Sequence, residues 1–190
     1  MKRTLALALT LALLLCAACA WAEEQPLTLE QLGGMEWSFS SGVGGWSTDM
    51  RTAADGTFSG EYHDSEMGET GDNYPNGSVY GCAFKGQLSL VEQLDEHSWK
   101  VRIDKLEIDG TLKEESIDDG IRYVVSEPNG ITEGDEMVLY LPGTPVDVLS
   151  EDMQMWAHLL EQDPKPTALE DWFLMSEKND SGFVGYKGDE

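Results

Sequence analysis

The stretch from Met35 to Asp64 constrains the fold more than any other part of this chain. Apolar or aromatic side chains alternate with polar ones from Met35 to Ser40, and a similar two-residue period recurs from Trp46 to Arg51 and from Phe58 to Tyr62. A glycine-rich turn and an Asp-Gly turn separate the three segments. Alternation with turn residues between the runs is typical of an antiparallel β-meander. The pattern therefore predicts a mainly β fold.

Strand patterns continue along most of the remaining chain. The predicted strands cover residues 78–94, 98–108, 121–125, 136–141, 171–177 and 182–186. The first of them is either one long bent strand or a pair of strands. The parity of the apolar residues changes near Asp104-Lys105, which predicts a β-bulge there. Turn signals spaced by about eight to twelve residues favour a barrel or a sandwich over βαβ units.

The connections carry their own signals. Asp109-Gly110 and Asp118-Asp119-Gly120 predict β-hairpins. Residues 64–77 are polar and rich in glycine, and we expect them to form a long exposed loop. The segment from Leu27 to Leu32 precedes a Gly-Gly pair and is expected to form a helical turn that closes one end of the fold.

One C-terminal α-helix is predicted between Thr144 and Leu160. Thr144 is a suitable N-cap, Pro145 suits the first helical position, and Asp147 lies in the first turn. Apolar residues recur at spacings of three and four, at Val146, Leu149, Met153, Trp156 and Leu160. This stripe favours a helix packed on a barrel or sheet, and the alternative is that its Met and Trp line a ligand site.

The first 22 residues have the organisation of a secretory signal peptide. Lys2 and Arg3 precede an apolar run that ends in Ala20-Trp21-Ala22. Cleavage after Ala22 leaves residues 23–190 as a single domain, and the apolar run is shorter than the roughly 20 residues that a membrane-spanning helix needs. We therefore expect a secreted, extracellular protein. The alternative is a lipoprotein that is anchored at Cys19 and faces outward.

Charge restricts the partners of the mature chain. The full chain has 12 Lys and Arg residues and 36 Asp and Glu residues, and residues 1–22 include two of the basic residues and none of the acidic ones. The mature chain thus has 10 basic and 36 acidic residues, a net charge of −26. This balance argues against nucleic acid and anionic membranes, which need a cationic surface. It suits a solvated extracellular protein, a cationic partner or bound divalent ions.

Motifs for nucleophilic, phosphate or zinc chemistry are missing from the mature sequence. It contains no G-x-S-x-G elbow and no H-E-x-x-H pair. Its one cysteine, Cys82, shares a strand face with Tyr80 and Phe84 and is expected to be a buried thiol. We predict that the protein is not an enzyme. The alternative is a hydrolase that uses a pair of carboxylates among its many acidic residues.

Two sets of side chains are candidate binding residues. Carboxylates at short intervals in a glycine-containing loop suit Ca²⁺, and a solvated acidic loop is the alternative. These candidate ligands are Asp64, Glu66, Glu69 and Asp72. Aromatic residues often line barrel interiors that hold a ligand, and ordinary core packing is the alternative. The aromatic candidates are Trp37, Trp46, Tyr62, Tyr80, Trp99 and Trp156.

Several segments resemble a family of uncharacterised secreted or lipoprotein domains from Gram-positive, gut-type bacteria. The segments are residues 32–37, 39–46, 55–62, 121–123 and 140–146. This family implies no activity that can be transferred. The start of the meander is also similar to lipocalin-like (calycin) barrels, which bind small apolar ligands. The lipocalin pattern has Gly-x-Trp, whereas two residues separate Gly34 from Trp37 here.

We therefore predict an antiparallel meander β-barrel of the lipocalin-like kind, or a coiled β-sandwich, with one C-terminal helix. The leading functional hypothesis is a secreted, non-enzymatic binding module that holds a small apolar molecule in a barrel cavity. A second hypothesis is an acidic, inhibitor-like protein whose surface binds a cationic partner. The third is the carboxylate hydrolase.

Overall fold

The computed structural model describes residues 26–188 of the chain. The elements in this part are α2 (Leu29–Leu32), β1 (Met35–Ser40), β2 (Trp46–Thr52), β3 (Thr57–Glu66), β4 (Ser78–Gln93), β5 (Ser98–Ile108), β6 (Glu115–Asp118), β7 (Ile121–Val125), β8 (Glu136–Tyr140), the 3-10 helix η1 (Val146–Val148), α3 (Glu151–Trp156), β9 (Trp172–Ser176) and β10 (Ser181–Lys187). The predicted signal peptide and Cys19 lie outside the described residues. Within them, the helices are all too short or too polar to cross a membrane.

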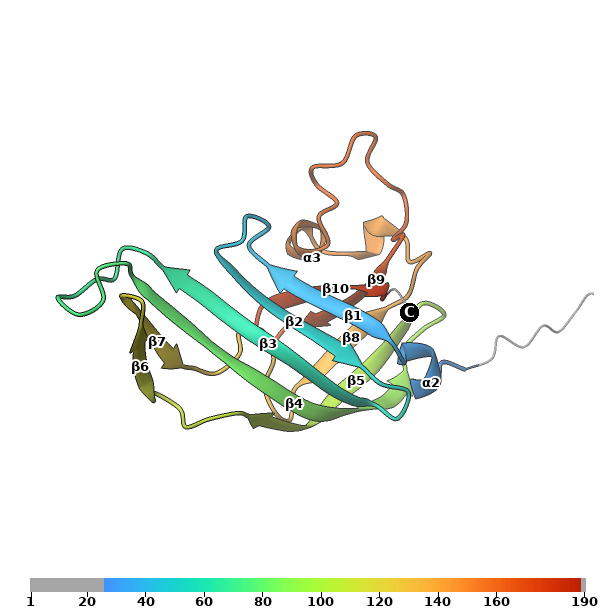
Figure 1. The fold of residues 1–190 in the computed structure, drawn as a ribbon. Coiled ribbons are helices and arrows are strands. Elements are labelled where there is room, and N and C mark those ends of the chain that lie inside the picture. Colours follow the sequence, from blue (N-terminus) through green and yellow to red (C-terminus); the bar gives the residue numbers. More distant parts are fainter. Residues whose placement is uncertain (1–25, 189–190) are drawn as a thin grey trace, which may run out of the picture.

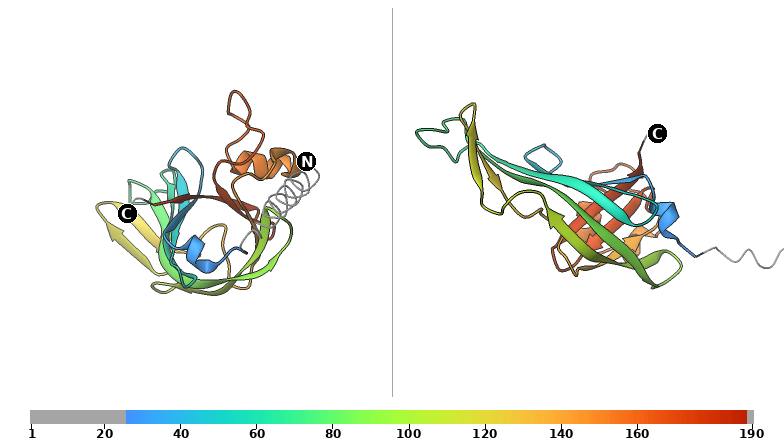
Figure 2. Two further views of the ribbon diagram at one scale, coloured as in Figure 1. Left: turned by 90° about the vertical axis from the view of Figure 1, so that its right-hand side faces the viewer. Right: turned by 60° about the horizontal axis from the view of Figure 1, so that its bottom comes forward.

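Eight of the strands close into an antiparallel barrel (Figure 1). Their order is β3-β2-β1-β10-β9-β8-β5-β4, and β4 pairs with β3 to complete the circle. Figure 2 (left) looks along this barrel and shows α2 lying across one of its openings. The predicted antiparallel barrel is confirmed, and so is the meander, because β1, β2, β3 and β4 pair in chain order.

A second small sheet projects from the barrel. β3 and β4 run on past the barrel wall, β7 pairs with β4 in parallel from Ser78 to Gly81, and β6 pairs with β7. Figure 1 shows these strands extending to the left of the barrel, and Figure 2 (right) shows how far they project. We call residues 61–83 and 109–125 the arm.

The arm corrects two predictions from the sequence. β3 continues to Glu66, so the loop that was expected over residues 64–77 begins only after that residue. Asp109-Gly110 makes a turn but no hairpin, because β5 does not pair with β6. The second hairpin is confirmed: Asp119 and Gly120 have φ values of 47° and 77° in the two-residue turn between β6 and β7.

Side chains of the chain itself fill the barrel. The inward residues of β1, β2, β3, β4, β5, β8, β9 and β10 belong to one buried cluster, which includes Trp37, Phe39, Met50, Phe58, Phe84, Leu88, Val101, Ile103, Met137, Leu139, Leu174 and Phe183. At the end nearest α2, Leu32 joins this cluster. Towards the arm, the Thr48 and Ser181 hydroxyls donate to the carbonyls of Asn129 and Gly130, and the adjoining Ile131 is fully buried. The segment around Gly130 thus closes the barrel on the arm side.

Aromatic rings cover the glycines of the inner wall. Phe58 lies opposite Gly86, Phe84 lies opposite Gly60, and Trp37 lies opposite Gly185 in neighbouring strands. A Cβ atom at any of these glycines would stand under 3 Å from the ring opposite. Each aromatic ring therefore fits against the barrel wall because the residue opposite it on the neighbouring strand is a glycine, which has no side chain.

The bulge predicted near Asp104 is confirmed. Gln87 pairs with Lys105, whereas the next residue of β4, Leu88, pairs with Ile103, so Asp104 is the extra residue. The insertion moves Leu106 onto the inner face, where it packs against the core.

The predicted C-terminal helix is wrong in its extent. Two short helices, η1 and α3, replace one helix over residues 144–160, and the N-cap of α3 is Ser150, whose hydroxyl accepts from the Met153 amide. Leu149 between them is extended, with ψ of 136°. The chain before η1 is held in extended pairing, since the Val146 amide donates to the Thr167 carbonyl. Val146, Leu149, Met153 and Trp156 still pack with Phe173 in a second cluster on the outside of β9 and β10, but Leu159 takes the place predicted for Leu160.

Candidate functional site

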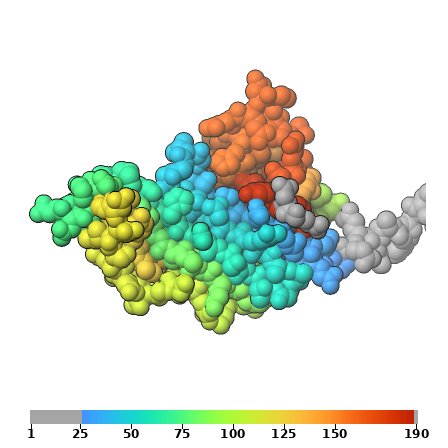
Figure 3. Space-filling view, viewed as in Figure 1, coloured from blue at the N-terminus to red at the C-terminus, as the bar shows by residue number. Residues whose placement is uncertain are grey.

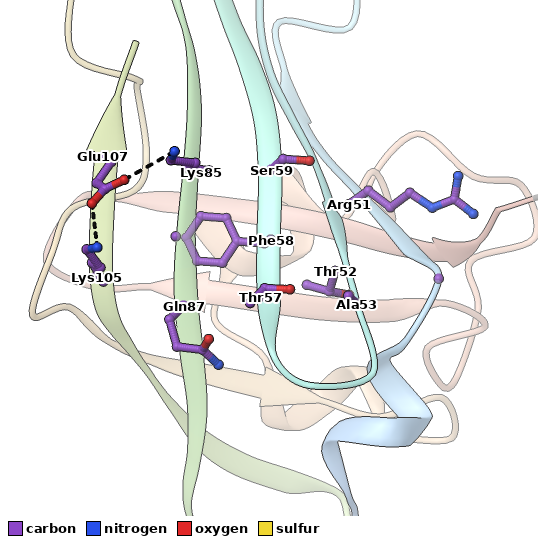
Figure 4. Close-up of a pocket in the computed structure, with 12 residues that line it drawn as sticks. Arg51, Thr52, Ala53, Thr57, Phe58, Ser59, Lys85, Gln87, Lys105 and Glu107 are labelled. Carbon is purple, nitrogen blue, oxygen red and sulfur yellow. Dashed lines mark ion pairs between the residues drawn. The ribbon is translucent and has the colours of Figure 1, made fainter.

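Three hollows of the described residues lie on the outer face of β2, β3, β4 and β5 and on the arm. One of about 810 Å³ spans β2 to β5 near Arg51 and Lys85 (Figure 4), and one of about 650 Å³ lies beside it. A third, of about 330 Å³, lies on the arm and shares Glu61 and Ala83 with the second. We call this continuous surface the outer trough.

Small outward residues make the floor of the outer trough. In register across β3 and β4, Ser59 lies opposite Lys85, Glu61 opposite Ala83, and His63 opposite Gly81. Each pair combines a long side chain with a short one. The outer trough is therefore deepest over the short side chains, and the long side chains form its borders.

The barrel end of the trough is basic, but its charges are already paired. Lys85 lies 3.4 Å from Glu107, Lys105 also contacts Glu107, and Arg51 lies 3.8 Å from Glu36. Figure 4 shows Glu107 between the two lysines. The hydrogen bond from Lys105, followed by that from Lys85, lowers the pKa of Glu107. These exposed pairs satisfy one another and leave little net attraction for an anion.

The arm end of the trough has the opposite character. Val79, Tyr123 and Val125 lie around the hollow of about 330 Å³, and Glu61 and Glu114 stand at its rim. Tyr123 is 41 % exposed. Within residues 26–188, neither rim carboxylate has a basic partner within 4.0 Å. This surface combines exposed apolar area with uncompensated negative charge.

Arg122 holds the inner face of the arm together. Its guanidinium lies 2.6 Å from Glu69, donates to the hydroxyls of Ser78 and Tyr80 at 3.1 Å each, and stacks 4.8 Å above the Tyr74 ring. The hydrogen bond from Tyr80, and then that from Arg122, lowers the pKa of Glu69. A single side chain on β7 therefore binds both the loop that follows β3 and the strand β4, and so holds the two together.

Sequence reasoning missed this role of Arg122. Its strand was predicted, and Arg122 is one of only ten Lys and Arg residues among residues 26–188. One partner, Glu115, lies 3.7 Å away and only seven positions back in the chain, but the others are 42 to 53 positions away, so no local pattern could assign them. The scarcity of basic residues was the one available signal that Arg122 would carry an ion pair.

The six predicted aromatic residues do not line one cavity. Trp46 and Trp156 come together around Phe39, with ring centroids 4.8 Å and 4.9 Å from the Phe39 ring and 6.4 Å apart. Trp37 is a core residue whose indole donates to Thr52. Trp99 packs against the core from β5.

The two predicted tyrosines lie on the inner face of β3 and β4. Tyr62 is half-buried, and burial, reinforced by the charge of Asp64, raises its pKa to about 12. The Tyr80 hydroxyl donates to Glu69 at 2.6 Å, within the cluster around Arg122. Cys82 between them was predicted to be buried and is half-buried instead; desolvation raises the pKa of its thiol to about 11. A protonated thiol of this kind is a poor nucleophile.

The four predicted Ca²⁺ ligands are dispersed along the arm. Asp64 and Glu66 belong to β3, while Glu69 and Asp72 lie in the loop that follows. Glu69 is engaged by Arg122 and Tyr80. In the described part of the chain, no three His, Cys, Asp or Glu side chains gather closely enough to hold a metal ion.

Comparisons with known proteins add no relative to this picture. No protein-family model, curated protein or solved structure significantly matches the chain.

Proposed function

We propose that this protein is a non-enzymatic binding module that captures a cationic polypeptide on its arm. The observation that carries the proposal is the arm hollow, where Val79, Tyr123 and Val125 are accessible beside the carboxylates of Glu61 and Glu114. A lysine or arginine side chain matches such a surface, because its aliphatic stem can cover apolar groups while its charged head remains near carboxylates.

The charge of the arm supports a cationic partner. Residues 61–83 contain five acidic and no basic residues, and residues 109–125 contain five acidic and two basic ones, which is a net charge of −8. One of the two basic residues, Arg122, is already paired with Glu69 at 2.6 Å and with Glu115 at 3.7 Å. A projection with this charge would attract a basic partner before contact and would favour rapid association.

The contents of the barrel favour a surface site over an internal one. The inward side chains of eight strands meet in one buried cluster, so the position that an apolar ligand takes in a carrier barrel is occupied by the chain itself. The hollows described above all lie on the outside. A carrier function would require the core to open.

The test uses a fluorescein-labelled, capped octapeptide of alternating lysine and valine, with binding followed by anisotropy. We expect binding to weaken steeply between about 0.05 and 0.5 M NaCl, since the Debye length falls from roughly 14 to 4 Å over that range. The double variant Glu61→Gln/Glu114→Gln should weaken binding several-fold, because each exposed ion pair contributes about 0.2–1 kcal/mol. Glu161→Gln/Glu170→Gln makes the same charge change away from the arm and should bind as wild type does.

Two results would contradict the proposal. Binding that is indifferent to salt would remove the electrostatic basis. Equal weakening by the two double variants would show that total charge, rather than the arm, attracts the peptide.

We also propose that the protein is exported and acts outside the cell. The support is the signal-peptide pattern of residues 1–22. Intact mass of the mature protein from its native host tests this: a chain that begins at Glu23 is expected, a lipid-bearing chain that begins at Cys19 would replace secretion by anchoring, and a chain that retains residue 1 would refute export through cleavage.

A further inference from the structure

We infer that the arm takes its cationic partner as an added β-strand on the free edge of β6. This inference rests on the proposed function and specifies the conformation of the partner: an extended basic segment of polypeptide. Main-chain hydrogen bonds to β6 would hold the segment, and the acidic side chains around β6 would select its charge.

β6 is the one strand of the described sheet that lies at an end of the strand order with a neighbour on a single side. The barrel strands close on each other, whereas the arm continues from β4 to β7 and stops at β6. All four residues of β6 are exposed. In Figure 3 the arm projects clear of the barrel, so a second chain could approach it. The edge is therefore available to a partner strand.

The hairpin turn decides which main-chain groups of β6 are free. Asp118 pairs with Ile121 across the two-residue turn, and Ser116 pairs with Tyr123. Residues that flank a two-residue turn exchange both of their hydrogen bonds, and the bonded pairs then recur at every second position. The Val125 amide donates to the Glu114 carbonyl at 3.0 Å, which fits the same phase.

It follows that Glu115 and Ile117 direct their N–H and C=O groups away from β7. No other backbone group in residues 26–188 bonds to them outside the strand pairing. These two residues offer two donors and two acceptors to an adjacent strand, enough to hold a short extended segment in register.

Charge decides what kind of strand fits. β6 reads Glu115-Ser116-Ile117-Asp118, Glu114 precedes it and Asp119 follows it. A second copy of this chain would bring the same four carboxylates against these, and like charges across a strand pair are destabilising. A basic strand would instead pair opposite charges at each side, so the acidic edge rejects self-association and accepts a cationic segment.

The two faces of β6 also fit alternating side chains. Ser116 faces the arm hollow next to Tyr123, and Ile117, which is 49 % exposed, lies on the face of Arg122. A strand added to β6 would place every second side chain beside each face. An alternation of lysine with an apolar residue would thus contact carboxylates and apolar surface together.

The test compares the lysine–valine octapeptide with the same peptide N-methylated at its four central amides. Methylation removes donors from both edges of the peptide and keeps its charge, so affinity should fall about tenfold or more if main-chain bonds form. On the protein side, Ile117→Pro removes the outward N–H, and proline is tolerated on an edge strand. Ile117→Val retains the N–H and is the matched control. Hydrogen exchange with the unmodified peptide should slow at the amides of Glu115 and Ile117 more than at Ser116.

The outcomes separate the two proposals. Weak binding of the methylated peptide and of Ile117→Pro, with new amide protection at Glu115 and Ile117, supports strand addition. Equal affinity for both peptides, with binding still sensitive to salt and to Glu61→Gln/Glu114→Gln, overturns strand addition and leaves the proposed function in place. Should Ile117→Pro disturb the hairpin, the methylated peptide decides the question on the wild-type protein. Absence of any arm-dependent binding overturns both.

Discussion

Replacement of Gly86 by alanine should destabilise the barrel, because Phe58 already occupies the space that the new methyl group needs. A Cβ at position 86 would stand 2.8 Å from Cε1 of Phe58 and closer still to its Cζ. Ordinary contact begins near 3.4 Å, so the tip of the ring would have to retreat by about 1 Å. Figure 4 shows Phe58 reaching from β3 towards β4 at this point.

The surroundings leave no easy adjustment. The Phe58 side chain is 4 % exposed and meets the Phe84 ring edge-on at 6.3 Å between centroids. The new Cβ would also clash with the carbonyl oxygen of Lys105, a backbone atom of β5, whose next residue, Leu106, lies opposite Gly86. An extra methyl group in a packed core typically lowers the free energy of unfolding by about 1–3 kcal/mol. Because this site has both a tightly packed ring and a backbone contact, we expect a loss near the upper end, at about 2–3 kcal/mol.

Urea unfolding followed by tryptophan fluorescence measures the loss, and the melting temperature should fall by roughly 5–10 °C. Gly68→Ala is the matched control, since a Cβ at Gly68 meets nothing within 4 Å. Phe58→Leu should cost less in the Gly86→Ala background than in wild type, because the shorter side chain relieves the clash. A Gly86→Ala variant within about 0.5 kcal/mol of wild type would refute the reasoning.

Three further predictions concern other parts of the molecule. Thr52→Val should lower the free energy of unfolding in urea by about 2–3 kcal/mol, because the buried indole of Trp37 loses its acceptor at 3.2 Å. A loss no larger than that of a Thr→Val change at an exposed position would contradict this. Cys82 should react with iodoacetamide at pH 8 about 100-fold more slowly in the folded than in the unfolded protein, since a pKa near 11 in place of 9.0 reduces the thiolate by that factor; equal rates would exclude the raised pKa. The lowered pKa of Glu69 means that its hydrogen bonds with Tyr80 and Arg122 contribute stability at pH values above the ordinary pKa of 4.5, and this contribution is lost as pH falls from there through the lowered pKa. Hydrogen exchange should therefore show the arm opening before the barrel on acidification, and Glu69→Gln should remove this pH dependence.

Local patterns were sufficient wherever the structure depends on neighbouring residues. The alternation in the first strand correctly placed Met35, Trp37 and Phe39 in the core, where each is at most 3 % exposed. The parity change near Asp104 located the bulge, because a strand with one buried face must insert a residue to restore its phase. The two-residue turn at Asp119 and Gly120 could be predicted because Asp and Gly are residue types that adopt positive φ.

Local patterns failed where distant segments compete for the same residues. The helical spacing from Val146 to Leu160 is real, yet the chain is held in extended pairing with Thr167 up to Val146 and is extended again at Leu149, so α3 begins only at Glu151. The aromatic candidates shared a residue type but not a location, since Trp37 and Trp99 pack in the core while Tyr80 joins Arg122 on the arm.

The sequence by itself predicted the eight barrel strands and β7, most of their turns and the high negative charge, because each of these is a property of consecutive residues. The tertiary structure alone decided that the barrel interior would be filled, that β7 would join β4 in parallel, and that β6 would end as an open edge. Parallel pairing of β7 with β4 joins residues 44 positions apart, and its free-energy gain depends on the bonds that Arg122 makes with Ser78 and Tyr80 after the chain has folded back. Such long-range gains leave no periodic trace in the order of the amino acids.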